Sequence, residues 1–451
     1  MKEQFPTTEQ PVEKAPADEQ KKPSQEGGLV GDEQKRRERI AGLQRSATLF
    51  DEQFVRTQTH GSPERRLQTQ KTIESLSHGS LLESGAIGDE DKASQNVVRR
   101  NTYEGDPPRI AYVKPQSGES WFDYDAQNDT ARVIRLRRGE AGTLEEEEVD
   151  LGIADERQKT ILQRALSRKV KEAHAVAEDI ARYYDIEPSE APNSGDKVGK
   201  LFGLEAGDAP VREFAVSRID MMVGFDTVPV TVLREEPDHS DISSVQEAVK
   251  SANPEKPARP MNLKDLQSLI DQGPEHPGAQ SFMRIASLDY LVKSLDRHTN
   301  NVLYDEEAQQ FHAIDNGGSL GLNRRTEDGA SKPADNYHSV PMEVLSRHPE
   351  WQLDEEAMTQ LTELKDAVYA YLQKREIQST GSDEGQEMKQ ITNLFRILYP
   401  NPKIAKVEGA QFLARIDRLI KDGRPPVDEL ISANQLQTKT VDKAVKAQQA
   451  A

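Results

Sequence analysis

Apolar positions recur along the chain with two different spacings, and these spacings predict where helices and strands lie. From Leu144 to Tyr184, offsets of three and four residues dominate, which indicates a long amphipathic helix or a helix pair. Short apolar runs at 110–115 and 228–233 are typical of strands. The same reasoning predicts further helices at 211–223, 261–272, 279–295, 353–377, 386–398, 407–421 and 427–437.

The stretch from Asp289 to Leu322 predicts a helix, a polar loop, a strand pair and a second polar loop. The first loop reads DRHTNN, and the apolar runs 302–304 and 311–314 flank a turn-rich acidic segment. Because a tight turn brings the ends of two strands together, Asn301 before the first strand and Asp315 after the second should lie side by side.

The polar residues of this stretch are those that phosphoryl transfer needs. Asp296 is the candidate base that takes or orients the attacking hydroxyl. Asn301 and Asp315 offer hard oxygen ligands, which suit Mg²⁺. His298 either shares the task of Asp296 or is a structural histidine that bonds to the loop backbone, and the residues leave both interpretations open. Arg297 is expected to hold the loop together.

The two loops also resemble a known family. D-R-H-x-x-N followed by I-D-N-G resembles the catalytic and metal loops of the protein-kinase-like superfamily, and most of all its phosphatidylinositol 3-/4-kinase-like branch with its bacterial members. Ordinary protein kinases carry H-R-D-x-x-x-x-N and D-F-G. The resemblance implies an α+β, two-lobed protein-kinase-like fold, with a helical insertion in the small lobe and a mainly helical large lobe.

Four further positions gain a role from this resemblance. In the family, a strand that ends in Lys-Pro carries the lysine that grips the nucleotide phosphates, and Lys114 matches it. The helix VREFAVSRIDMMV resembles the helix whose carboxylate pairs with that lysine, which makes Glu213 the partner. Residues 243–249 take the place of the interlobe hinge that holds adenine, with Gln246 and Val249 as candidate contacts. Without the resemblance, Lys114 is an ordinary surface lysine and Glu213 serves the helix dipole.

Composition limits the remaining choices. The 451 residues are 35% hydrophobic and 5% aromatic, which is low for a fully packed chain. A net charge of −19 argues against nucleic acid or an anionic membrane as a partner. The absence of cysteine excludes disulfides and thiolate chemistry. With no signal sequence and no apolar run of membrane-spanning length, we expect a cytoplasmic protein without an integral membrane segment, although export without a signal stays open.

These observations predict four regions and one activity. The activity is an ATP- and Mg²⁺-dependent phosphotransfer to a hydroxyl, with protein Ser/Thr favoured over phosphoinositide because no marked basic or apolar surface follows Asp315. The alternatives are an inactive kinase-like scaffold and an adenylyl transferase on the same fold. The arm and the insertion are candidate surfaces for a protein partner. The regions are a disordered or helical arm (1–75, with 1–35 disordered), a small lobe (76–249) with the insertion at about 144–184, a large lobe (250–437) and a flexible tail (438–451).

Overall fold

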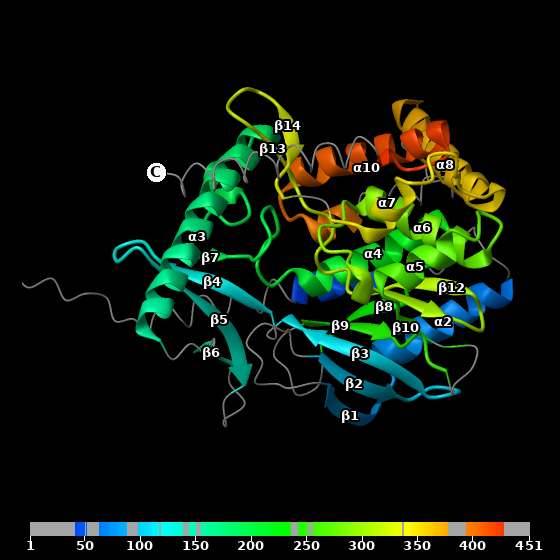
Figure 1. Cartoon of the computed structure of the whole chain (residues 1–451), viewed down its shortest axis with the longest axis horizontal. Helices are drawn as coiled ribbons and strands as arrows, with labels where there is room; N and C mark the ends of the chain where they lie inside the picture. The colour runs from blue at the N-terminus through cyan, green and yellow to red at the C-terminus, as the bar shows by residue number, and fades with distance from the viewer. Residues whose placement is uncertain are drawn as a thin grey trace, which may run out of the picture.

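The computed structural model describes an α+β protein with four sheets and a set of packed helices (Figure 1). The predictions for residues 1–35 and 438–451, most of the helix at 386–398 and nearly all of the helix at 427–437 lie outside the described residues. Among the helices of the described ranges, none has both the length and the apolar character needed to cross a membrane. The described residues are 41–49, 51, 63–87, 98–116, 119–138, 144–149, 155–235, 242–249, 251, 256–335, 338–377 and 394–427.

A five-stranded antiparallel sheet with the order β1-β2-β3-β9-β8 carries the lysine strand. Along β3, Ala111 and Val113 are buried, whereas Lys114 points to the opposite face, as expected from the two-residue period of a strand. Helix α2 (Pro63–His78) packs Ile73 and Leu76 against Ala111 and Val113, so the predicted arm boundary at residue 75 falls inside a packed helix. The strands are β1 (Leu81–Ile87), β2 (Val98–Tyr103), β3 (Arg109–Pro115), β8 (Thr231–Glu235) and β9 (Ile242–Glu247).

The described residues of 120–198 form a second sheet as well as a long helix, and the predicted insertion at about 144–184 covers only part of this unit. Residues 144–148, expected at the start of the helical region, form strand β6, and α3 begins only at Glu156. The acidic run is extended because its side chains meet basic ones on other strands of the same sheet: Glu147 pairs with Arg135 of β5 at 3.2 Å, and Glu146 pairs with Lys197 of β7 at 2.7 Å. The elements are β4 (Ser120–Asp125), β5 (Thr130–Arg138), β6 (Leu144–Glu148), β7 (Lys197–Val198) and α3 (Glu156–Tyr184), with the strand order β6-β5-β4-β7.

Most of the remaining helices lie on the opposite side of the molecule from α3 and the β6-β5-β4-β7 sheet (Figure 1). Helix α4 (Ala209–Val223) is buried along nearly its whole length and packs against β8, β9 and α8. It ends at Gly224, whose φ of 71° is the left-handed conformation that glycine adopts without strain. The other helices are α5 (Leu263–Ile270), α6 (Pro277–Val292), α7 (Val340–Leu345), α8 (Glu355–Ile377) and α10 (Pro402–Asp422).

Two small sheets complete the fold. In the first, β11 (Val302–Asp305) pairs with β12 (Gln310–Ala313) and with β10 (Arg259–Pro260), which confirms the predicted strand pair. The second is a hairpin of β13 (Asn323–Arg325) and β14 (Ser331–Pro333) beside α3.

This hairpin belongs to the segment that follows Asp315 in the chain. It is held to α3 by a hydrogen bond from the Asn323 backbone N–H to the Tyr184 hydroxyl, at 3.0 Å.

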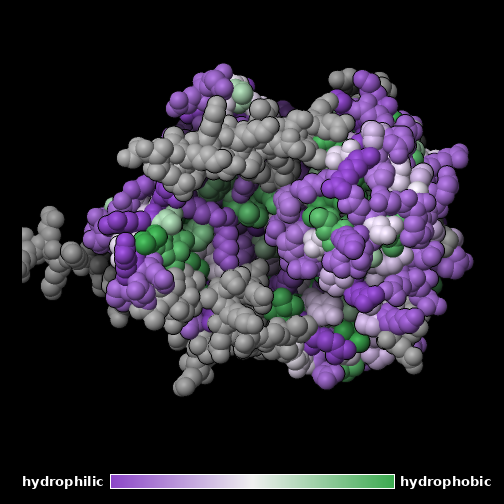
Figure 2. Space-filling model, in the orientation of Figure 1, coloured by the Kyte–Doolittle hydropathy of each residue, from purple (hydrophilic) through white to green (hydrophobic). Residues whose placement is uncertain are grey.

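On the face shown in Figure 2, hydrophilic residues cover most of the described surface, in keeping with a chain that is 30% charged.

Candidate active site

Three charged side chains from distant parts of the chain meet at the end of β3. Lys114 Nζ lies 2.8 Å from Glu213 Oε1 of α4 and 2.8 Å from Asp315 Oδ1, just after β12. Glu213 is buried, whereas the side chain of Asp315 is 51% exposed. Burial by itself lowers the pKa of Lys114, but the two carboxylates outweigh it and raise that pKa above the usual value. Lys114 in turn lowers the pKa of Asp315. The lysine is therefore a permanent cation beside an accessible carboxylate.

Local structure explains how the hairpin places Asp315. The register of β11 with β12 sets Val302 opposite Ala313, and the backbone N–H of Ile314 donates to the Asn301 carbonyl at 3.0 Å. The two loops therefore leave the strand pair next to each other, as the sequence predicts. Asp315 itself has a φ of 55°, so the chain turns sharply there and the carboxylate is directed at Lys114.

The loop before the strand pair, which carries Asp296 and Asn301, lies against the loop that carries Asp315. The side-chain amide of Asn301 donates to the Asp296 carbonyl at 2.9 Å. Burial raises the pKa of Asp296, His298 opposes that shift and Asp315 adds to it, so the two aspartates lie close enough to affect each other's charge. A Cβ atom on Gly318 would lie only 3.1 Å from Asp296 Cβ, so the second loop passes directly over the first.

Arg297 holds both loops together. Its guanidinium is fully buried and donates to the carbonyl oxygens of Asn301 and Ile314 and to the side chain of Asn316. It also forms an ion pair with Asp289 of α6, at 3.1 Å. The prediction that Arg297 supports the loop is confirmed.

Sequence reasoning missed the residues that support Arg297. Asp289 accepts a hydrogen bond of 2.7 Å from the Ser339 hydroxyl, at the start of α7. The sequence contained a signal, because Asp289 is an acid on the apolar face of a predicted helix, and a buried acid requires a partner. Helix α4 makes a further link, since Arg212 Nε donates to the Gly317 carbonyl at 2.6 Å.

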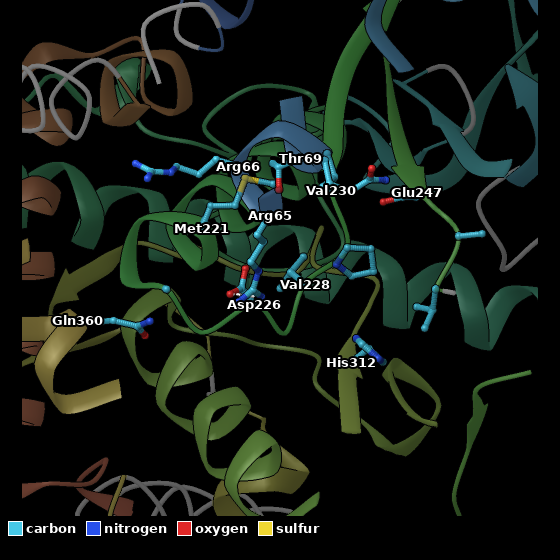
Figure 3. A pocket seen from close by; sticks show the side chains of 15 residues that line it. Arg65, Arg66, Thr69, Met221, Asp226, Val228, Val230, Glu247, His312 and Gln360 are labelled. Atoms are coloured by element: carbon cyan, nitrogen blue, oxygen red, sulfur yellow. Dashed lines mark ion pairs between the residues drawn. The ribbon is translucent and has the colours of Figure 1, made fainter. Parts of the chain in front are cut away.

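The two predicted hinge residues make different contacts. The Gln246 side chain is buried on β9 and donates to the Thr231 hydroxyl at 3.2 Å. Val249 lines a cavity of about 320 Å³, whose walls include α2 and the end of α4. Figure 3 shows this cavity, with Arg65 of α2 directed at Asp226. Lys114 and Asp315 are not among the residues that line it.

The donor set at the loops fits one class of metal ion. Asp315 and Asn301 supply a carboxylate and an amide, and within the described ranges no cluster of three or more His, Cys, Asp or Glu could hold a metal. Two oxygen ligands are too few for a closed protein cage. They suit Mg²⁺, which commonly keeps water and takes its other ligands from substrate phosphates. The residues present are therefore compatible with magnesium held together with a nucleotide.

Comparison with known proteins adds little to this geometry. No model of a protein family matches the chain, and a search of curated proteins gives no match either. Among solved structures, the chain is similar to the Helicobacter pylori proinflammatory kinase CtkA, at 8% sequence identity and a TM-score of 0.27. The match covers 74% of this chain and 98% of that one. A TM-score this low does not define the fold, so any functional conclusion depends on the site itself.

Proposed function

We propose that this protein is an ATP- and Mg²⁺-dependent phosphotransferase with a two-lobed protein-kinase-like fold. The observation that carries the proposal is the position of Lys114, which is 2.8 Å from the buried carboxylate of Glu213 and 2.8 Å from the half-exposed carboxylate of Asp315. Glu213 orients the cation, and Asp315 lies where a nucleotide phosphate with its magnesium would meet it. Asp296 and Asn301 are on the adjoining loop.

The proposed step transfers one phosphoryl group. The acceptor hydroxyl oxygen forms a bond to the γ-phosphorus while the bond from that phosphorus to the β-phosphate oxygen breaks, and ADP leaves with the electron pair. The hydroxyl proton passes to the carboxylate of Asp296. Lys114 holds the phosphates in place, and Asn301 and Asp315 would hold Mg²⁺, which when bound neutralises phosphate charge.

For the acceptor, we propose a protein serine or threonine hydroxyl in preference to a phosphoinositide. The residues that follow Asp315 fold into the β13–β14 hairpin, and this hairpin packs against α3. Of its basic side chains, Arg325 is exposed, and Arg324 and Lys332 are partly buried, with Arg324 3.6 Å from Asp179. So small a basic surface favours a protein acceptor over the anionic headgroups of a membrane.

The test uses the full chain with ATP labelled at either the γ- or the α-phosphate, a generic protein acceptor and a panel of phosphoinositide vesicles. We expect transfer of the γ-label to protein, loss of transfer in Asp315→Ala, and no loss in Asp328→Ala, an exposed acid in the turn of the β13–β14 hairpin. Transfer of the α-label would instead identify an adenylyl transferase. Thermal stabilisation by Mg–ATP with no transfer of either label would favour the inactive scaffold.

A further inference from the structure

An N-terminal segment is built into the core beside α4. Residues 41–49 are helical, and Leu43 and Ala47 are buried in the main hydrophobic cluster. Asp51 follows and meets Arg218 of α4, whose Nε donates to Asp51 Oδ1 at 2.7 Å. The Arg218 side chain is fully buried. The sequence predicted only an arm here, because the carboxylate and its partner are 167 positions apart.

Arg218 lies on the helix that carries Glu213. Its guanidinium lies over the ring of Phe214, 4.6 Å from the ring centroid, and Phe214 directly follows Glu213 in the chain. A buried guanidinium that loses its carboxylate is strongly unfavourable, so α4 with Arg218 in the interior depends on Asp51 being present. The same helix, five residues earlier, carries Glu213, whose Oε1 lies 2.8 Å from Lys114 Nζ.

We propose that the helix at 41–49 and Asp51 form an internal docking segment that positions α4 and thereby holds Glu213 against Lys114. Asp51 is a positioning residue, because it acts through Arg218 and touches none of the candidate active-site side chains described above. Its effect on nucleotide binding rests on the proposed function, whereas its effect on α4 does not.

The first measurement is hydrogen exchange of the full chain without nucleotide. In Asp51→Asn, we expect amides of α4 to exchange about tenfold faster, while amides of α10 keep their wild-type rates. Asp51→Glu keeps the charge and should restore most of the protection. Glu156→Gln is the matched control, since it removes an acid from an exposed ion pair on α3. Unchanged exchange in α4, or equal acceleration in α4 and α10, would overturn the proposal.

The second measurement is the Kd for Mg–ATP in four proteins: wild type, Asp51→Asn, Lys114→Met and the double variant. We expect Asp51→Asn to raise the Kd about tenfold in the wild-type background and to have no further effect once Lys114 is gone, because both residues act through the same ion pair. Independent effects of the two substitutions would contradict the proposed route through Glu213. A wild-type chain that does not bind Mg–ATP would overturn the proposed function, and the exchange experiment would still decide whether Asp51 positions α4.

Discussion

Two lysines of this protein each meet a glutamate, and their surroundings differ. Lys114 contacts Glu213 and Asp315, with 20% of the Lys114 side chain and 51% of the Asp315 side chain exposed. Lys293 lies 2.5 Å from Glu408, with exposures of 1% and 0%. The hydroxyl of Tyr184 also donates to Glu408. One cluster is therefore open to a ligand on one side, whereas the other is sealed.

The difference shows how the burial and the partners of an ion pair determine its role in the protein. Burial lowers the pKa of Lys293 to about 8 even though Glu408 opposes the shift, whereas at Lys114 the two carboxylates outweigh burial and raise the pKa. The Lys293 cluster links the end of α6 to α3 and α10, and its charges are used within the core. The Lys114 cluster retains an exposed acid, which under the proposed function would hold Mg²⁺ while Lys114 contacts the phosphates. We therefore assign stability to the first cluster and propose ligand binding for the second.

The largest expected effect is the loss of phosphotransfer activity when Lys114 is replaced. Lys114→Met should reduce phosphotransfer by roughly 10³-fold, because a cation fixed at the phosphates stabilises charge in the transition state. It should also cost some stability, because it leaves the buried carboxylate of Glu213 without its cation, but less than the matching change at Lys293, since Lys114 is partly exposed and Asp315 is half in water. Initial rates with γ-labelled ATP and chemical denaturation of the same protein measure the two effects. A large loss of stability with near-normal rates would reverse the assignment.

The matching substitution at the sealed lysine should behave in the opposite way. Lys293→Met leaves the Glu408 carboxylate buried without its cation, and we expect a loss of about 3–5 kcal/mol in the free energy of unfolding. Urea denaturation measures this loss. A stability change below about 1 kcal/mol would show that the sealed pair is not a core element.

Replacing both charges should recover most of that loss. In Lys293→Met with Glu408→Leu, neither charge has to be buried, and such replacements are often neutral. We expect the double variant to unfold within about 2 kcal/mol of the wild type, since the Tyr184 hydroxyl loses one partner. Denaturation of both single variants and the double variant gives the coupling energy. Additive losses would mean that the two residues do not act as a pair.

The smallest expected effect concerns pH. Burial raises the pKa of Asp296 above its usual 3.8, and the proposed base must be ionised to accept a proton. The transfer rate should therefore be full well above the raised pKa and fall as pH decreases through it. The acid limb should lie above the pH at which an ordinary aspartate titrates. In Asp296→Asn, the residual rate should no longer show this limb. An unchanged limb in that variant would assign it to another group.

Much of the candidate site could be predicted from the chain alone. The turn between two short apolar runs was enough to place Asn301 beside the loop of Asp315, because a hairpin is a local structure whose ends must meet. The helix that carries Glu213 and the glycine that ends it were equally clear. The pairing of Lys114 with Glu213 was expected only through the family resemblance, since a separation of 99 residues leaves no local trace. The ion pair of Lys114 with Asp315, 201 residues away, was not predicted.

Other features were decided only when distant segments came together. The acidic residues 145–148 allow a helix or a strand, and their pairing with basic residues of β5 selects the strand. Asp51 looks like any acid of a polar arm until Arg218 becomes its buried partner. Asp289 needs Arg297 and Ser339 to account for its burial. The physical reason is the same in each case. Periodicity and turns express interactions between near neighbours, whereas the burial and pairing of a charge depend on residues that only the folded chain brings into contact.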